Sequence, residues 1–276
     1  MTVRQPIHLI INADDYGYYP CISKGILEAV SSGAVTATGI MANSPNLKMQ
    51  LEWLNSVTAL DFGVHLNLTF RQPLTAVMAD KLAHWKGCFP NAYSMTGMLL
   101  TGKISVQDVR SEWSAQIEAC QGQKLQFLNS HEHIHMLPIL FPLMLELAYK
   151  YAIPHVRLTQ AEWLRPFGIS ALVRNTLMQA MQTINKPKLK VNSPVFLGLS
   201  QSGKLDFNYL EKIFSKLKPG QHYELMCHPG RFNAGEISDP KLMSYHDWDG
   251  ELALLQSQEV HALYEKFGIR LSYYQQ

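Results

Sequence analysis

The stretch IHLIINADDYG, residues 7–17, reads as a buried β-strand that ends in two adjacent carboxylates. The segment CISKGILEAVSSG (21–33) follows, with apolar residues every three or four positions and Gly33 as a stop signal. The chain therefore opens with a strand followed by a helix, which is the repeating unit of an α/β protein.

Seven further extended segments follow, and helical patterns separate several of them; the clearest helical stripes lie in 106–120 and 252–267. Alternation of strand and helix favours a parallel sheet with right-handed crossovers, and about eight such units can close on themselves. We therefore expect an α/β fold of the (β/α) barrel type, with irregularities, rather than an open doubly wound sheet. The expected strands after the first are 36–42, 61–68, 125–131, 155–159, 194–200, 223–229 and 269–274.

The length and composition suit one large core. With 276 residues, of which 47% are hydrophobic, the chain is expected to form a single domain over residues 1–276. Its one long interruption, residues 71–103, lies between the third strand and its helix and mixes aromatic, Pro and Gly residues. An interruption of this kind fits a lid or sugar-stacking wall over a site and, equally well, an ordinary surface excursion.

The charge balance and the cysteines argue against several classes of partner. The net charge of +2 provides no strong field for nucleic acid or an anionic membrane. The first apolar run is broken after a few residues by Asn12 and Asp14, which makes it too short for a signal peptide or a membrane span. Four widely spaced cysteines form no CxxC pair. We therefore expect a cytoplasmic protein that acts on a small, nearly neutral molecule.

Polar residues stand at the carboxyl ends of four expected strands: Asp14 and Asp15, His65, His131 and His228. Taken singly, such an Asp is often a helix cap, and such a His is often a core residue. In a parallel barrel, however, these strand ends meet on one face, where active sites are found. We therefore expect the five side chains to converge on one site.

The adjacent carboxylates indicate a metal, because two carboxylates after an apolar strand repel each other unless a cation or a shared proton compensates. One carboxylate and two imidazoles, Asp15, His65 and His131, would leave open positions for water and substrate on Zn²⁺ or another divalent ion such as Mg²⁺. Asp14 then fits the general base and His228 the acid that protonates a leaving amine.

The segment NSHEHIHMLP (129–138) carries His131, His133 and His135. Strand alternation would place all three imidazoles on one face, although only one of them is needed as a ligand. The candidate substrate-binding residues of the chain are Asn67, His133, His135, Arg157 and Trp85.

Several motifs together resemble the YdjC-type carbohydrate deacetylases, which include chitooligosaccharide deacetylases. INADDYG resembles the family's NADDFG, and SSGAVTATGIMAN its G-x-VT-x-T segment. GVHLNLT, SHEHIHMLP and CHPG resemble the family's G-x-H-L-x-LT, SH-x-H-x-H-x-xP and HPG, in the expected order. The resemblance spans residue 7 to about residue 230 and is far more specific than any single motif.

The resemblance implies a single catalytic domain with a glycoside hydrolase or deacetylase-like barrel that removes an N-acetyl group from an amino sugar or oligosaccharide. It also implies that Asp15, His65 and His131 bind one divalent metal and that Asp14 is the base. It supports a place for His228 in the site; the acid role of His228 rests on the chemistry above. A homodimer is compatible with the sequence, which does not specify the oligomeric state.

Two departures from the family pattern adjoin the proposed ligands. Asn129 stands where the chitooligosaccharide enzymes often have Asp, and Glu132 replaces their second consecutive histidine. If either residue orients an imidazole, metal preference or substrate fit would differ. Two other functions stay open: a metal-dependent hydrolase of another amide or of a phosphoester, and a sugar-binding protein without catalysis.

Overall fold

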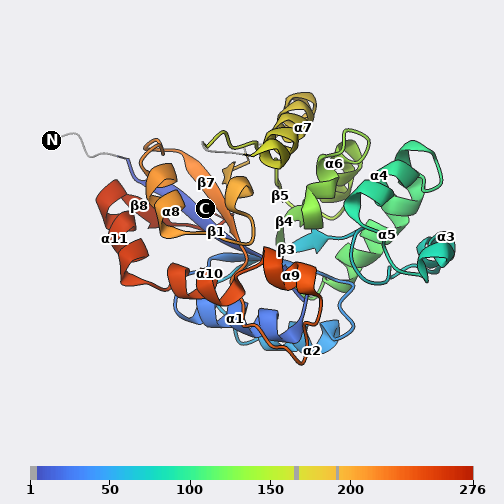
Figure 1. Cartoon of the computed structure of the whole chain (residues 1–276), viewed down its shortest axis with the longest axis horizontal. Helices are drawn as coiled ribbons and strands as arrows, with labels where there is room; N and C mark the ends of the chain where they lie inside the picture. Colours follow the sequence, from blue (N-terminus) through green and yellow to red (C-terminus); the bar gives the residue numbers. More distant parts are fainter. Residues whose placement is uncertain (1–4, 165–167, 191–192, 276) are drawn as a thin grey trace.

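The computed structural model describes residues 5–164, 168–190 and 193–275, which form one parallel β-sheet surrounded by helices (Figure 1). Each of the eight expected strands is present in this part of the chain. The strands are β1 (Ile7–Tyr16), β2 (Ala37–Ile40), β3 (Asp61–Leu66), β4 (Leu125–Ser130), β5 (His155–Val156), β6 (Val195–Leu197), β7 (His222–Cys227) and β8 (Ile269–Leu271).

The sheet is a curled half-barrel. Its strands follow the order β5-β4-β3-β2-β1-β7-β6, and β8 pairs with β1 off this path. All of the strand pairs are parallel. Within the described ranges no pairing joins β5 to β6, so the sheet stays open there. The (β/α) barrel prediction is confirmed, and its irregularity is this open seam.

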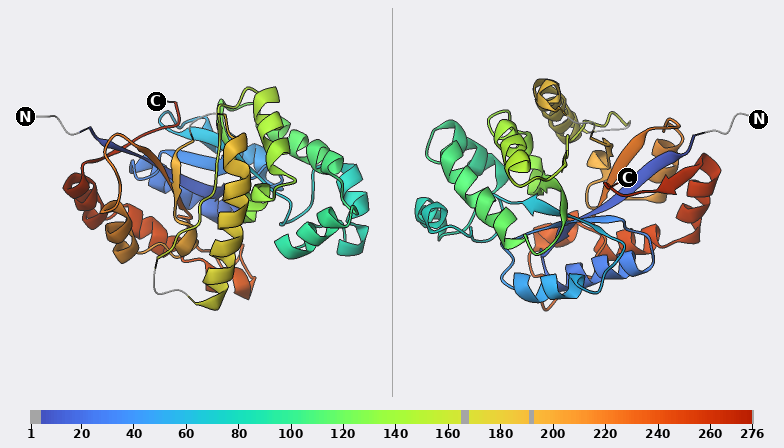
Figure 2. Two further views of the ribbon diagram at one scale, coloured as in Figure 1. Left: turned by 90° about the horizontal axis from the view of Figure 1, so that it is seen from above. Right: turned by 180° about the vertical axis from the view of Figure 1, so that it is seen from behind.

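Helices cover the outside of the sheet (Figure 2). Helix α1 packs against β1, α5 against β3, and α6 against β4 and β5, while α8 and α11 pack together near β8. The α-helices are α1 (Pro20–Ser31), α2 (Leu47–Leu54), α3 (Ala76–Lys81), α4 (Ala92–Leu100), α5 (Val106–Ala119), α6 (Phe141–Lys150), α7 (Ile169–Asn185), α8 (Phe207–Phe214), α9 (Pro240–Tyr245), α10 (Trp248–Leu255) and α11 (Gln258–Phe267). The 3₁₀ helices are η1 (Ala83–Trp85), η2 (His131–Met136), η3 (Lys186–Lys188) and η4 (Leu199–Gln201).

Two segments differ in detail from what the sequence predicts. The long interruption at 71–103 contains α3, η1 and α4, so it is largely helical. The stripe at 252–267 forms two helices, because the Ser257 side chain accepts a hydrogen bond from the Val260 N–H and begins a new helix there. None of the described helices is long and apolar enough to cross a bilayer.

The alternation of β1 separates the core from the site. Leu9 and Ile11 belong to the large core beneath the helices, whereas Ile10 lies inside the half-barrel with Phe127 and Tyr274. The Phe127 and Tyr274 rings stack there with centroids 4.5 Å apart. By the same alternation, every second residue further along β1 faces the barrel interior, which places polar side chains in the site.

Candidate active site

A break in strand geometry brings both carboxylates of β1 to the site. Neighbouring residues of a regular strand point to opposite faces. Here the register of β1 with β2 shifts between Ala13 and Tyr16, and Asp15 has a φ of 70°. A left-handed backbone is costly for a residue other than Gly and is typical of functional sites. This local strain lets Asp14 and Asp15, both 1% exposed, take part in one polar cluster.

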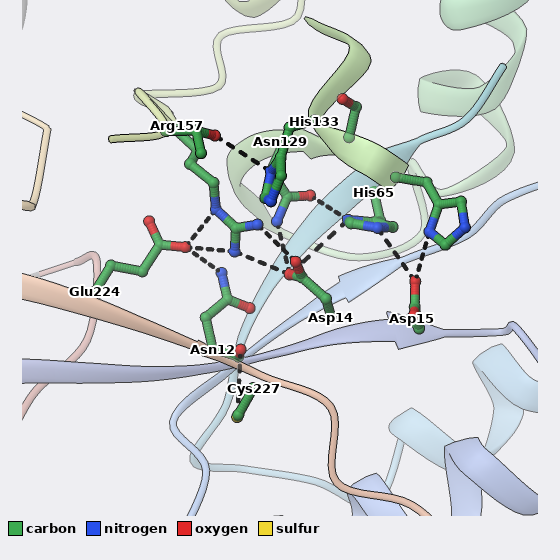
Figure 3. Close-up of polar contacts among 12 residues, drawn as sticks. Asn12, Asp14, Asp15, His65, Asn129, His133, Arg157, Glu224 and Cys227 are labelled. Atoms are coloured by element: carbon green, nitrogen blue, oxygen red, sulfur yellow. Dashed lines mark hydrogen bonds and ion pairs between the residues drawn. The ribbon is translucent and has the colours of Figure 1, made fainter. Parts of the chain in front are cut away.

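Asp15, His65 and His131 meet as the sequence predicts. Figure 3 shows the contact between Asp15 and His65. Asp15 Oδ1 lies 3.2 Å from His65 Nε2 and 3.0 Å from His131 Nδ1. One potential ligand atom from each residue lies within 4.8 Å of the others. Burial opposes ionisation of Asp15, but the neighbouring His131 and His65 hold its pKa well below the usual range. The cluster therefore presents a carboxylate to two imidazoles.

Asn129 fixes the orientation of His65. Its side-chain N–H donates to Asp14 Oδ1 at 2.9 Å, so its carbonyl oxygen is the atom that lies 2.8 Å from His65 Nδ1. That oxygen can only accept, and it therefore requires a proton on Nδ1. In neutral His65 the lone pair then sits on Nε2 and faces Asp15. Of the two departures from the family pattern, Asn129 is thus the one that orients an imidazole, whereas the Glu132 side chain is exposed.

The geometry of the Asp15 cluster fits a divalent cation. In neutral His65, the Nε2 lone pair and the Asp15 carboxylate are two electron-rich groups 3.2 Å apart. Asp15 Oδ2 is buried and has no hydrogen-bond partner among the described residues. A cation between these atoms would satisfy both of them, and one carboxylate with two imidazoles is a donor set that suits Zn²⁺.

Asp14 belongs to a second network inside the half-barrel. The Arg157 guanidinium donates to both oxygens of Asp14, at 2.6 and 2.9 Å, and its Nε donates to Glu224 at 2.7 Å. Asn12 also donates to Glu224, at 3.0 Å. Burial works against the charge of Asp14, but Arg157 and then His65 lower its pKa to about 2. Asp14 is therefore an ionised carboxylate in a fixed orientation at neutral pH.

Arg157, which the sequence suggests as a substrate-binding residue, makes its contacts with carboxylates of the protein itself. Arg157 is only 2% exposed, and its guanidinium binds Asp14 and Glu224. Direct recognition of a substrate is therefore not what its geometry supports; it positions Asp14. Burial lowers the pKa of Arg157, but the two carboxylates outweigh this effect and raise it.

The three histidines of SHEHIH do not share a strand face, so the prediction of alternation is wrong. Strand β4 ends at Ser130, and Glu132 and His133 have left-handed φ values of 50° and 54° within η2. His133 Nδ1 lies 3.2 Å from the Thr159 hydroxyl, on the Arg157 side of the site. Burial and the charge of Arg157 lower the pKa of His133 well below its usual value, so it is neutral. His133 is thus a neutral, polar ring beside Arg157 and Thr159.

His135 supports the backbone instead of facing a ligand. It is fully buried, with Nδ1 2.6 Å from the Ser130 hydroxyl and Nε2 3.0 Å from the Arg157 carbonyl. Burial lowers the pKa of His135 to about 3. Both ring nitrogens are engaged, so the structure does not support the predicted substrate contact. His135 instead links the end of β4 to the segment that carries Arg157.

The contacts of Asn67 and Trp85 are with residues outside the Asp15 cluster. Asn67 is buried; its side chain donates to the Phe70 carbonyl and accepts from the Thr69 N–H, which shapes the turn after β3. Trp85 lies in η1, is 40% exposed and has His84 as an edge-on ring neighbour. Within the described residues no ring contact joins Trp85 to the Asp15 cluster.

His228 follows β7 at the opposite side of the site. Its backbone N–H donates to buried Glu251, and its Nδ1 is buried without a hydrogen-bond partner among the described residues. Its ring centroid lies 5.2 Å from that of His246. Burial and the neighbouring His228 lower the pKa of His246 to about 3. His228 also contributes to lowering the pKa of Asp14, which places these two residues within electrostatic reach of each other.

Three residues around the site were not predicted as site residues from the sequence: Asn12, Glu224 and His246. Glu224 carried a readable signal, since it is a charged residue in the middle of the apolar strand YELMC. Asn12 stands two positions before Asp14 and therefore shares its strand face. His246 follows a short helix in a polar loop, where a histidine has no distinctive pattern.

Fold and site define a class of parallel half-barrel proteins that gather carboxylates and histidines at the strand ends. Within that class, the chain belongs to the YdjC-like protein family, whose profile matches residues 8–266, and the resemblance noted from the motifs is confirmed. A carbohydrate deacetylase of Geobacillus stearothermophilus is 31% identical over 226 residues, covering 81% of this chain and 80% of the relative.

Two other relatives span nearly the whole chain. A chitooligosaccharide deacetylase of Yersinia enterocolitica is 26% identical over 284 residues and covers 96% of this chain and 97% of its own. A crystal structure of an Enterococcus faecalis V583 protein proposed to cleave cellobiose-phosphate is 25% identical, with a TM-score of 0.73 and 98% of both chains covered.

Proposed function

We propose that the protein is a metal-dependent hydrolase that removes an N-acetyl group from an amino sugar or an oligosaccharide. One observation carries the proposal: the two adjacent carboxylates have different partners. Asp15 faces His65 and His131, whereas Arg157 and Asn129 hold Asp14 beside them. Amide hydrolysis with an activated water needs this division into a ligand and a base. The names of the deacetylase relatives support the choice of an acetamide.

The roles of the residues follow from their contacts. When bound by Asp15, His65 and His131, a divalent ion such as Zn²⁺ or Mg²⁺ would polarise the acetamide carbonyl and acidify a water molecule. Ionised Asp14 accepts the proton of the attacking water, and Arg157 and Asn129 keep its oxygens in place. His228 gives a proton to the departing amine. His133, neutral and held by Thr159, is the remaining predicted substrate contact whose position favours that role.

The decisive experiment measures acetate release from N-acetylglucosamine, N,N′-diacetylchitobiose and longer chitooligosaccharides. The protein is first stripped with a chelator and then resupplied separately with Zn²⁺, Mg²⁺, Ni²⁺ or Co²⁺. We expect release only after metal is restored. The Asp14→Asn variant, loaded with the same metal, serves as the inactive control.

A parallel panel separates this function from its competitors. It contains cellobiose, phosphorylated cellobiose and a phosphate monoester, and it is scored for new reducing ends and for free phosphate. Cleavage of these compounds without acetate release from any N-acetylated sugar would overturn the proposal in favour of another hydrolase. Sugar binding without cleavage of any substrate, in metal-loaded protein, would identify a binding protein.

A further inference from the structure

The segment that follows β8 is tied to three strands of the half-barrel. The Ser272 N–H donates to the Leu9 carbonyl of β1 at 2.9 Å, and the Tyr274 N–H donates to the carboxylate of Asp61, the first residue of β3. His155, the first residue of β5, holds the Tyr274 carbonyl, with its Nε2 2.9 Å from that oxygen. The backbone at Tyr274 is therefore fixed from both sides.

The ring of Tyr274 is packed inside the half-barrel. It is 5% exposed and stacks on Phe127 with an interplanar angle of 23°. Ile10 of β1 belongs to the same cluster. The hydroxyl at the tip of the ring reaches Asn12, which stands two positions after Ile10 and so shares its strand face. Packing of the ring thus delivers one hydroxyl to the face of β1 that carries Asp14.

The Tyr274 hydroxyl joins two groups of the buried network. It accepts from the Asn12 side-chain amide at 3.1 Å, so its own proton remains available for donation. Burial and then the charge of Glu224 raise the pKa of Tyr274 well above its usual value, and a hydrogen bond with Glu224 adds to this effect. The hydroxyl is therefore a neutral group that accepts from Asn12 and donates to Glu224.

Glu224 transmits this constraint to Asp14. One of its oxygens, Oε1, accepts from Asn12 at 3.0 Å and from the Arg157 Nε at 2.7 Å. Arg157 then donates from its other two nitrogens to both oxygens of Asp14 (Figure 3). A guanidinium is planar and rigid, so the carboxylates on its two edges fix each other's direction. A shift of Glu224 would therefore turn Asp14 as well.

We propose that Tyr274 is a positioning residue of the active site, whose hydroxyl fixes Asn12 and Glu224 and thereby the direction of the Asp14 carboxylate. The inference rests on the proposed function and deepens it, because proton transfer to Asp14 then depends on a residue outside the proposed ligands and substrate contacts. Members of a buried hydrogen-bond network reinforce one another, so loss of one hydroxyl affects more than its direct partners. Within the described residues, the hydrogen bonds of Tyr274 go to none of the three proposed metal ligands.

The test removes the hydroxyl and keeps the ring. Tyr274→Phe retains the stacking on Phe127, and Tyr273→Phe is the matched control, because it removes the hydroxyl of the neighbouring, partly exposed tyrosine. Acetate release from the N-acetylated sugar that the wild type deacetylates fastest gives kcat and KM for each metal-loaded protein. In Tyr274→Phe, kcat should fall about tenfold while KM and metal content stay within about twofold of wild type, because a misdirected base slows the reaction without weakening binding. The control should match the wild type in all three quantities.

A second measurement does not depend on turnover. The Arg157 Nε–H is buried against Glu224, so its ¹⁵N-NMR resonance, assigned from triple-resonance spectra, should exchange slowly with water in the wild type. In Tyr274→Phe the resonance should shift and its exchange should become at least about tenfold faster, because the partner of Arg157 is less firmly held. Tyr273→Phe should leave it unchanged. The same spectra show whether each variant is folded.

The outcomes separate the positioning role from the proposed function. If the wild type releases acetate and Tyr274→Phe keeps the wild-type kcat, the positioning role is wrong and the deacetylase function stands. An unchanged Arg157 resonance in Tyr274→Phe, or a loss of bound metal equal to the loss of turnover, would also overturn that role. If the wild type releases no acetate but the Arg157 resonance responds as expected, the proposed function is wrong, while Tyr274 is confirmed as the residue that holds Arg157 through Glu224.

Discussion

At the scale of single residues, the site depends on an amide side chain that lies between a carboxylate and an imidazole. Asn129 donates to Asp14 and accepts at His65 Nδ1, so one side chain orients both the proposed base and a proposed ligand. An aspartate at this position would still accept from His65, but it would place a second carboxylate against Asp14. The amide of Asn129 thus gives ionised Asp14 a hydrogen-bond donor, where an aspartate would give it a second negative charge.

Substitution of Asn129 tests this double role. Asn129→Leu removes the acceptor that orients His65, so metal affinity should fall about 10- to 100-fold, the usual cost of losing a partner of a metal-bound imidazole. Asn129→Asp keeps that acceptor and should bind metal with nearly wild-type affinity. Competition with a chromogenic chelator measures both. Equal affinities for all three proteins would show that Asn129 does not orient the ligand.

Because Asp14 lies outside the proposed metal ligands Asp15, His65 and His131, loss of metal and loss of turnover should be separable by mutation. His65→Ala and His131→Ala should lose stoichiometric metal and turnover together. Asp14→Asn should keep the metal and lower kcat about 10²- to 10⁴-fold, the usual contribution of a general base. Metal content by mass spectrometry and acetate release by an enzymatic assay measure the two effects. Full metal content in both histidine variants would refute the ligand assignment.

At the scale of elements, β7 supports the site through a buried charge. Glu224 pairs with Arg157 and accepts from Asn12, and all three side chains are shielded from water. Removing one partner from a buried ion pair leaves the other charge uncompensated. Strand β7 therefore couples the stability of the half-barrel to the orientation of Asp14.

Two variants of Glu224 separate its charge from its shape. Glu224→Gln keeps an acceptor for Asn12 and Arg157 but removes the charge, and it should lower the free energy of unfolding by about 2 kcal/mol. Glu224→Leu removes the acceptor as well and should cost about 3–5 kcal/mol. Urea denaturation at pH 7 measures both. A leucine variant as stable as the wild type would mean that the network does not stabilise the fold.

The elements also show what a sequence can reveal. All eight strands were predictable, because each is an apolar run between turn or helix signals. The η2 segment was not, since the left-handed backbone at Glu132 and His133 has no signal in residues other than Gly or Asn. The three ligand candidates were found because parallel strands bring their carboxyl ends together. Contacts across the barrel, such as that of Arg157 with Asp14, depend on side-chain direction and need the structure.

At the scale of the whole molecule, one aromatic ring fills the base of the half-barrel. A Cβ on Gly63 would come within 2.5 Å of the Phe127 ring, so β3 needs a glycine where β4 brings this ring across. The Phe127 ring stacks on Tyr274 and packs with Ile10 inside the half-barrel, at a distance of four residues along β1 from Asp14.

A methyl group added at Gly63 should destabilise the protein, and a smaller side chain at position 127 should relieve the effect. Gly63→Ala should lower the free energy of unfolding by about 1–3 kcal/mol, the usual cost of excess volume in a packed core. In combination with Phe127→Leu the two effects should not add, because the smaller side chain makes room for the methyl group. Thermal and urea denaturation of the four proteins complete the double-mutant cycle. Strict additivity would exclude the steric coupling.

The open seam of the sheet also bears on how the protein avoids self-association. A sheet that does not close presents unpaired N–H and C=O groups along its outer strands, and such edges can recruit strands from other molecules. Here β5 contains two residues and β6 three. Next to the seam, the Ser193 hydroxyl donates a hydrogen bond to the Val156 carbonyl. Edges this short offer too few consecutive hydrogen bonds to seed an intermolecular sheet, so the half-barrel stays open with little risk of aggregation.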